Sequence, residues 1–189
     1  TPGSQSCSPC ANGTYTSDTG KSVCQSCAAG SFQPAQGQQS CTACPSGRFV
    51  SLPGQDQCMD CAMGKFNGIS GRAECTPCAS GKFTNATAQL DCLSCEPGSV
   101  QPSSGQSVCA LCTYGRYQRD SAQLACNLCP VGTYTSSNGT TACTACVAGL
   151  YQNVPGQSSC VECDAGTYTQ TTSQSICLDC EAGKFANRT

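Results

Sequence analysis

Large apolar side chains recur at one regular place in this chain, once every 17 residues. All five Phe and five of the six Tyr fall there, and Val100 is the only exception. These aromatic positions are Tyr15, Phe32, Phe49, Phe66, Phe83, Tyr117, Tyr134, Tyr151, Tyr168 and Phe185. No apolar stripe with helical spacing lies between them, so the pattern predicts little or no helix.

Two small-residue positions keep the same phase as the aromatic residues. Glycine stands two residues before each aromatic position, from Gly13 to Gly183, where it suits a backbone with positive φ or the close approach of another strand. A second small residue, such as Gly20 or Ala88, follows and marks a turn. The expected fold is therefore a small disulfide-rich β fold, an elongated tandem array of about eleven hairpin-like units of 17 residues.

The cysteines follow the same period of 17 residues. All 22 lie in Cys-x-x-Cys pairs, which run from Cys7 and Cys10 to Cys177 and Cys180. A unit of 17 residues cannot bury enough apolar area to offset its ordering entropy, and covalent staples are the usual remedy. Because disulfides persist in oxidising surroundings, we expect an extracellular or cell-surface location.

Charge and composition exclude several classes of function. The chain has 9 Lys and Arg, 11 Asp and Glu, and no His, a balance that argues against nucleic acid as a partner. It contains no apolar run long enough to span a membrane, so we expect no membrane contact within this segment. Redox catalysis needs one Cys-x-x-Cys at the start of a helix, which this pattern does not predict. We expect no enzyme, no catalytic residue, no cofactor and no metal.

Zinc binding is the main alternative use of the cysteines. The spacing Cys-x2-Cys-x13-Cys-x2-Cys is close to that of zinc ribbons. Eleven pairs cannot all be grouped in twos, however, and nine basic residues would not neutralise a series of four-thiolate sites. Disulfides are the favoured interpretation, with zinc as the alternative.

The repeated motif resembles a known family. Residues 129–146, beginning Cys-Pro-Val-Gly-Thr-Tyr, and the stretch Cys44-Pro45-Ser46-Gly47-Arg48-Phe49 are similar to the ephrin-receptor-like cysteine-rich repeat. The resemblance covers essentially the whole chain. The motif is also similar to the single-disulfide module that opens many tumour-necrosis-factor-receptor repeats. It implies an extracellular β-rich rod of the kind found in large surface proteins and receptor ectodomains, and it does not imply an enzyme.

The resemblance also implies a disulfide pairing. In the receptor module the cysteine before Gly-x-aromatic bonds to the cysteine that closes the same unit. Carried over, each bond closes a loop of about 15 residues and contributes about 3 kcal/mol. A crossed pairing between neighbouring Cys-x-x-Cys pairs, such as Cys10 with Cys27, is the alternative. The implied pairs are Cys10–Cys24, Cys27–Cys41, Cys44–Cys58, Cys61–Cys75, Cys78–Cys92, Cys95–Cys109, Cys112–Cys126, Cys129–Cys143, Cys146–Cys160 and Cys163–Cys177; Cys7 and Cys180 would pair with cysteines outside this segment.

The period also defines the expected domain organisation. We expect one continuous array over residues 1–189, with partial units at both ends, as a fragment of a longer protein. The expected complete units are 10–26, 27–43, 44–60, 61–77, 78–94, 95–111, 112–128, 129–145, 146–162 and 163–179.

Four Asn-x-Ser/Thr sequences are candidate N-glycosylation sites. They are Asn12, Asn85, Asn138 and Asn187. Unmodified turn asparagines are the alternative interpretation.

The leading functional hypothesis is an extracellular structural rod or spacer, a building block of a surface filament or matrix assembly. Identical spacing would give each unit the same rise and rotation, which suits assembly. The expected partners are other copies of the chain, other surface or filament proteins, and glycans. The alternative is a receptor or adhesin ectodomain that binds a protein ligand, for which only Tyr114-Gly115-Arg116-Tyr117 with Arg119 offers a suitable cluster.

Overall fold

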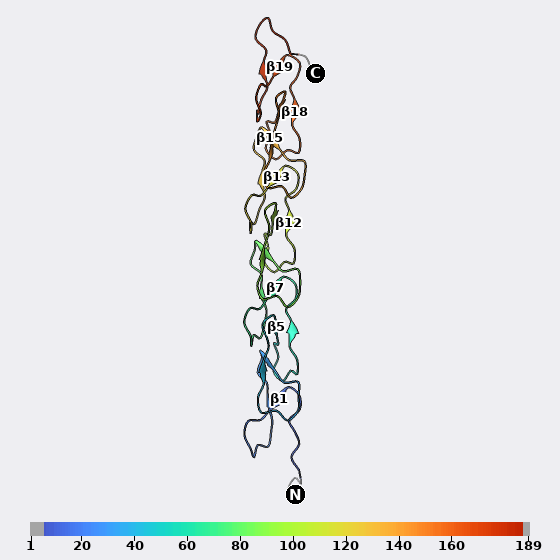
Figure 1. Cartoon of the computed structure of the whole chain (residues 1–189), viewed down its shortest axis with the longest axis vertical. Coiled ribbons are helices and arrows are strands. Elements are labelled where there is room, and N and C mark those ends of the chain that lie inside the picture. The colour runs from blue at the N-terminus through green and yellow to red at the C-terminus, as the bar shows by residue number, and fades with distance from the viewer. Residues whose placement is uncertain (1–5, 187–189) are drawn as a thin grey trace. The chain divides into compact units, whose positions relative to one another are not determined.

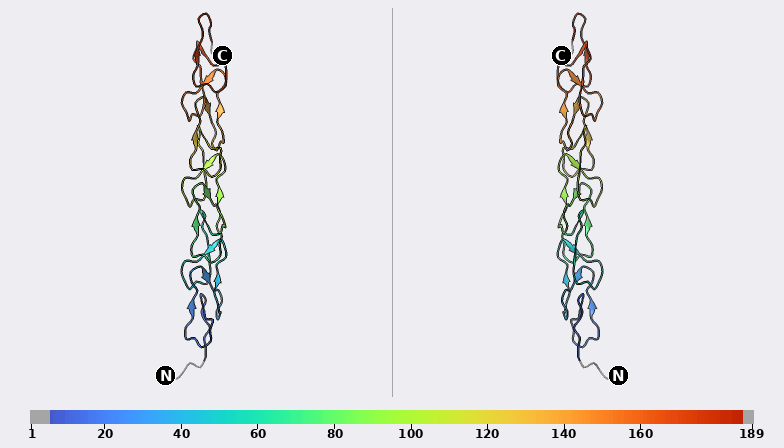
Figure 2. Two further views of the ribbon diagram at one scale, coloured as in Figure 1. Left: turned by 90° about the vertical axis from the view of Figure 1, so that its left-hand side faces the viewer. Right: turned by 90° about the vertical axis from the view of Figure 1, so that its right-hand side faces the viewer.

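The computed structural model describes residues 6–186 of the chain. Within these residues it contains no helix and twenty strands of two residues each, arranged as ten two-stranded sheets (Figure 1). Figure 2 shows the same short strands from two further sides. The predicted class, a disulfide-rich all-β tandem array with little or no helix, is confirmed.

Each sheet is one hairpin of one repeat, and its two strands follow each other in the chain. The hairpins are β1 (Thr14–Tyr15) with β2 (Gln25–Ser26), β3 (Ser31–Phe32) with β4 (Thr42–Ala43), β5 (Arg48–Phe49) with β6 (Met59–Asp60), β7 (Lys65–Phe66) with β8 (Thr76–Pro77), β9 (Lys82–Phe83) with β10 (Leu93–Ser94), β11 (Ser99–Val100) with β12 (Ala110–Leu111), β13 (Arg116–Tyr117) with β14 (Asn127–Leu128), β15 (Thr133–Tyr134) with β16 (Thr144–Ala145), β17 (Leu150–Tyr151) with β18 (Val161–Glu162), and β19 (Thr167–Tyr168) with β20 (Leu178–Asp179).

The register of the hairpins follows one rule. We count each repeat from the second cysteine of a Cys-x-x-Cys pair as position 1, so that Cys44 begins the repeat that contains β5 and β6. Position 5 then faces position 17 and position 6 faces position 16, as in Arg48 opposite Asp60 and Phe49 opposite Met59. A two-stranded hairpin of this length has little stability of its own in water. Other interactions must therefore hold the repeat.

The chain divides into two compact units built from the same repeat. The first comprises residues 1–79, 83–93 and 104–108, and the second comprises residues 80–82, 94–103 and 109–189. Within each unit, backbone hydrogen bonds tie every repeat to the next. In the first unit, Gly30 N donates to Val50 O at 2.8 Å, Gln33 N to Gln55 O at 3.2 Å, and Gly54 N to Cys27 O at 2.8 Å.

The second unit repeats this hydrogen-bond set residue for residue. Gly115 N donates to Thr135 O at 2.9 Å, Gln118 N to Thr140 O at 3.1 Å, and Gly139 N to Cys112 O at 2.8 Å. Because these bonds join backbone groups only, they do not depend on the side chains around them. The fold can therefore keep its geometry while most side chains change from repeat to repeat.

The glycine at position 4 has both a positive φ and a close contact with another part of the backbone, the two reasons for glycine that the sequence pattern suggested. Gly64 has a φ of 80°, and a Cβ atom placed on it would collide with the carbonyl oxygen of Gly105. Gly105 belongs to the second repeat after that of Gly64, and the position-4 glycines from Gly13 to Gly132 all pack in this way against the turn two repeats further along. Any side chain at Gly64 would push this turn away.

The core lies elsewhere than the aromatic pattern suggests. The aromatic residue is the one large apolar side chain of its unit, but the rings from Tyr15 to Tyr168 are only half-buried, and Phe185 is 82% exposed. The cysteines at position 1 are buried, and so is the residue that follows the aromatic, at position 7. The small core therefore consists mainly of cystine sulfur and of the position-7 side chains, most of which are polar.

Candidate functional site

The disulfides form one repeated series along the chain. They join Cys10–Cys24, Cys27–Cys41, Cys44–Cys58, Cys61–Cys75, Cys78–Cys92, Cys95–Cys109, Cys112–Cys126, Cys129–Cys143, Cys146–Cys160 and Cys163–Cys177, with Cα atoms 5.7 or 5.8 Å apart. These are the ten pairs that the resemblance implies. Each one closes the loop of a single hairpin.

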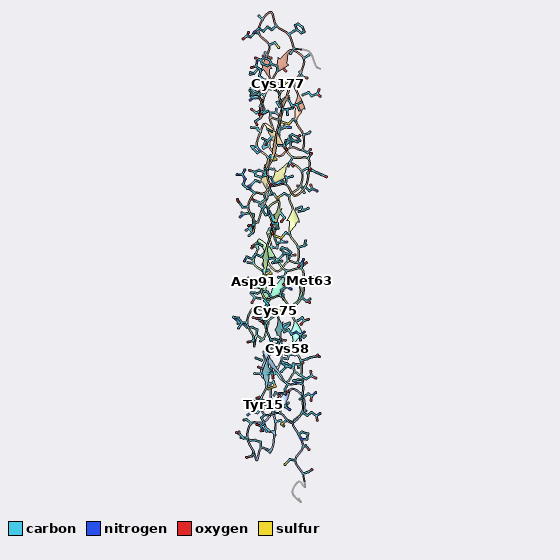
Figure 3. The ribbon with its side chains drawn as sticks, in the orientation of Figure 1. Tyr15, Cys58, Met63, Cys75, Asp91 and Cys177 are labelled. Atoms are coloured by element: carbon cyan, nitrogen blue, oxygen red, sulfur yellow. A yellow bond between two sulfur atoms is a disulfide. The ribbon has the colours of Figure 1, made fainter. Side chains whose placement is uncertain are left out.

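The two cysteines of one Cys-x-x-Cys pair belong to different disulfides. Cys58 bonds to Cys44 and closes one loop, whereas Cys61 bonds to Cys75 and opens the next (Figure 3). Their thiols are therefore unavailable both for zinc ligation and for the exchange chemistry of a redox motif. No cluster of His, Cys, Asp and Glu suited to a metal ion occurs among residues 6–186. The motif is a joint between covalently closed loops.

The two ends of each disulfide differ in exposure. Cys27, Cys44 and Cys61, at position 1, are fully buried, whereas their partners Cys41, Cys58 and Cys75 are half-buried. A reductant therefore reaches the bond from the position-15 side. Two cysteines stand outside the series as free thiols: Cys7, which is exposed, and Cys180, which is half-buried.

A buried polar side chain at position 7 organises the turn that follows it. Gln118 is 4% exposed; its Nε2 donates to Ala125 O at 2.8 Å and its Oε1 accepts from Asp120 N at 3.1 Å. Gln33 makes the equivalent bonds to Ser40 O at 2.6 Å and from Ala35 N at 3.1 Å. One glutamine thus joins both arms of its own loop and replaces hydrogen bonds that a short hairpin lacks.

Shorter residues at position 7 reach back to the preceding repeat. Thr84, 1% exposed, accepts at Oγ1 from Gly64 N at 2.8 Å, and Asn67 donates from Nδ2 to Arg48 O at 2.8 Å. The buried role of position 7 was not predicted from the sequence. The signal was present as a polar residue directly after nearly every aromatic, but a polar residue beside an aromatic one normally indicates the solvent side of a strand.

The aromatic rings make half of a cross-strand pair in each hairpin. Phe49 faces Met59, which is 52% exposed, and Tyr168 faces Leu178, which is 53% exposed. In other hairpins the partner is polar, as in Phe32 opposite Thr42. Because the partner changes from repeat to repeat, the rings do not form a uniform platform for one repeated ligand.

The candidate glycosylation sites lie on the surface where the structure describes them. Asn12, Asn85 and Asn138 are exposed, and Asn187 lies outside the described residues. The threonines of these Asn-x-Thr sequences differ in their local bonding. Thr140 Oγ1 hydrogen-bonds to Arg116 O at 3.3 Å and to Thr135 Oγ1 at 3.2 Å, and Thr14 Oγ1 donates to Ala11 O at 2.7 Å.

Two hollows on the surface are candidate ligand sites. One is lined by residues that include Cys7, Asp18 and Lys21, and the last two form an exposed ion pair at 3.3 Å. The other is lined by residues that include Tyr168, Glu181 and Lys184, and again its charges pair with each other, at 2.7 Å. Neither hollow gathers the convergent, unpaired polar groups of a binding pocket. Residues 6–186 contain no helix able to cross a membrane.

Comparison with protein families gives one match. The model of the family described as tyrosine-protein kinase ephrin type A/B receptor-like matches residues 16–54, 64–107, 98–142 and 132–180. The matched segments include every strand from β2 to β20 except β6. A search of curated proteins found none that matches the chain.

Proposed function

Because the chain belongs to the tyrosine-protein kinase ephrin type A/B receptor-like family, we propose that it is an extracellular structural spacer and a building block of a surface filament or matrix assembly. The family is one of non-catalytic cysteine-rich repeats, which is consistent with a chain that is not an enzyme. Ten disulfides and the membership of this family suggest an extracellular location.

The observation that carries the proposal is the constancy of the backbone contacts. The hydrogen bond from the position-4 glycine to the position-7 carbonyl of the next repeat recurs from Gly13 to Gly166, at 2.6 to 3.1 Å. The side chain at position 5, next to the donor glycine, changes from repeat to repeat, as in Thr14, Arg48 and Leu150. Constant backbone geometry with variable side chains supports a role in spacing and assembly over a repeated ligand-binding face.

Partners and modifications follow from the same proposal. We propose that the partners are other copies of this chain or other filament proteins, and that exposed Asn85 carries an N-glycan. Asn85 is exposed, and Thr87, the hydroxyl residue of its Asn-x-Thr sequence, accepts from Gln89 Nε2 at 3.4 Å through its backbone carbonyl. Peptide mass spectrometry before and after glycosidase treatment tests this: an aspartate at position 85 after treatment is expected, and an unmodified asparagine in the secreted protein contradicts it.

Electron microscopy of the secreted, oxidised protein at increasing concentration tests the assembly itself. Uniform fibres or ordered arrays are expected. Isolated particles at every concentration, together with saturable binding of a separate soluble protein, would contradict the proposal. That result would favour the receptor or adhesin alternative, with which the receptor-like description of the family is consistent.

A further inference from the structure

One pair of facing residues shows that the hairpin can hold an ion pair. In the β5–β6 hairpin, Arg48 at position 5 faces Asp60 at position 17, and Arg48 Nε lies 2.7 Å from Asp60 Oδ1. Both side chains keep about half of their surface exposed, at 50% and 43%. An acid at position 17 and a base at position 5 are thus within reach of each other on the surface of a hairpin.

In the β13–β14 hairpin the base is present and the acid is missing. Arg116 occupies position 5 and is exposed, but it faces Leu128, which is 47% exposed. No ion pair of Arg116 occurs among residues 6–186. Tyr114, 58% exposed, and Arg119 lie beside it in the chain. We call Tyr114, Arg116, Arg119 and Leu128 the basic surface.

A turn from a later repeat packs against the basic surface. A Cβ atom on Gly156 would lie 2.7 Å from Cδ2 of Leu128 and 3.8 Å from Gly115 O, so the turn at Gly156 packs against Leu128 of β14 and near the residue that precedes β13. The side chain of Leu128 is thereby fixed at one edge while its other face stays in solvent. Exposed Tyr and Arg on a supported surface are typical of the residues that contribute most to protein interfaces.

In the β17–β18 and β19–β20 hairpins the acid is present and the base is missing. Glu162 faces Leu150 and Asp179 faces Thr167, and neither acid has an ion pair within the described part of the chain. Exposed apolar residues accompany them, with Val161 46%, Ile176 58% and Leu178 53% exposed. We call Val161, Glu162, Ile176, Leu178 and Asp179 the acidic surface.

The charge distribution along the sequence reinforces this division. Between positions 120 and 183 there are five acidic residues and no Lys or Arg: Asp120, Glu162, Asp164, Asp179 and Glu181. The acidic surface therefore lies in a segment with no base of its own until Lys184, which pairs with Glu181 at 2.7 Å. Its nearest chemical complement is a surface that offers arginine beside exposed apolar groups.

We propose that the basic surface of one copy of this chain binds the acidic surface of a second copy. The contact completes between molecules the position-5 and position-17 ion pair that Arg48 and Asp60 make within one hairpin, and it covers the exposed apolar residues of both sides. Because the two surfaces differ and every copy carries both, the contact is heterologous and can continue from copy to copy. The inference rests on the proposed assembly function and identifies the residues that drive it.

Complementary charge reversal tests this contact with the full chain. Sedimentation velocity over a range of concentrations compares the wild type with two variants, Arg116→Glu and the double variant Glu162→Arg/Asp179→Arg. Each variant alone places like charges on both surfaces, so its self-association should weaken by about tenfold or more, and association of the wild type should weaken with salt. An equimolar mixture of the two variants restores opposite charges in both directions and should recover association.

Matched controls separate this effect from misfolding and from general charge effects. Lys65→Glu reverses an exposed base at the same position 5 in the β7–β8 hairpin, opposite Pro77, and should leave association unchanged. Recovery in the mixture also shows that both variants are folded. Wild-type assembly that survives Arg116→Glu, or a mixture that stays dissociated, overturns this contact and leaves the assembly function standing. A wild type that stays monomeric, or that uses Arg116 to bind a different protein, overturns both.

Discussion

The carbonyl oxygen of Gly105 packs against the Cα of Gly64 so closely that Gly64 has no room for a Cβ atom. Gly105 lies in the second repeat after that of Gly64. The same contact recurs between Gly47 and Ala88 and between Gly98 and Gly139. Each repeat is thus held by its own disulfide, by backbone hydrogen bonds to the next repeat, and by a steric fit to the repeat after that. This layered packing explains how units with almost no apolar core form an ordered structure.

Replacing Gly64 by alanine should destabilise the protein through two effects. The new Cβ would meet the Gly105 carbonyl, and the φ of 80° is unfavourable for alanine by roughly 1–2 kcal/mol. The matched control is Gly71→Ala, where φ is 78° but the nearest atom, the Cβ of Ala43, is 3.6 Å away. Denaturant unfolding with intact disulfides should show a clearly larger loss of unfolding free energy for Gly64→Ala. Equal losses would show that the close contact contributes nothing beyond backbone strain.

The opposite change should stabilise the turns that lack glycine. Ala88, Ala122 and Ser173 adopt φ values of 57°, 58° and 64° at position 11, where most repeats have glycine. Ala88→Gly removes the left-handed strain, of roughly 1–2 kcal/mol, but adds freedom to the unfolded chain, which offsets about half of the gain. We expect a net stabilisation of about 0.5–1 kcal/mol in the same unfolding experiment. A loss of stability would mean that the methyl group of Ala88 packs usefully.

Gln118→Leu should destabilise its loop although it makes the position more apolar. The substitution removes the hydrogen bonds to Ala125 O and from Asp120 N, a loss of about 1–2 kcal/mol in unfolding free energy. Gln123→Leu is the control, because Gln123 is exposed and its side chain bonds only to Ser121 O at 3.2 Å. Its effect should stay within about 0.5 kcal/mol. If the two variants behave alike, the buried glutamine does not organise the loop.

Removing one disulfide should weaken one hairpin far more than its neighbours. Cys61→Ala/Cys75→Ala opens a loop whose closure contributes about 3 kcal/mol, and it leaves a space where Cys61 was fully buried. Hydrogen exchange should show the greatest loss of protection at Cys78 N, which bonds to Gly64 O at 2.8 Å. Cys7→Ala, which removes a free thiol, should have no such effect. Uniform loss of protection over the whole unit would indicate full cooperativity between repeats.

The sequence was sufficient for the period, the class of fold and the conformation of the phased glycines. Gly64 shows why: a glycine that recurs at fixed phase indicates a backbone requirement, and both anticipated requirements apply there. The partner of the glycine could not be predicted, because contact with a turn two repeats away depends on the rotation between repeats. That rotation arises from backbone hydrogen bonds such as Gln33 N to Gln55 O, which leave no side-chain signature.

The interior was predicted less well than the backbone. Large apolar residues usually lie inside, but a repeat of this size leaves too little volume to enclose the ring of Phe49 or its equivalents. The small Cys44 side chain and the position-7 residue fill the interior instead. The disulfide pairing came from resemblance to a family and not from spacing, since spacing alone allows crossed pairs.

The account rests centrally on Cys-x-x-Cys as a joint between two covalently closed loops, and not as a zinc site or a redox site. Non-reducing peptide mapping tests it most directly at Cys58 and Cys61, because cleavage between Met59 and Asp60 separates these two cysteines. Further cleavage at Lys65 and Arg72 opens the second loop. The structure predicts that the Cys61 peptide stays bonded to the Cys75 peptide and that Cys58 stays bonded to Cys44. A Cys58–Cys61 bond, a crossed Cys44–Cys61 bond, or free thiols with bound zinc would contradict the account.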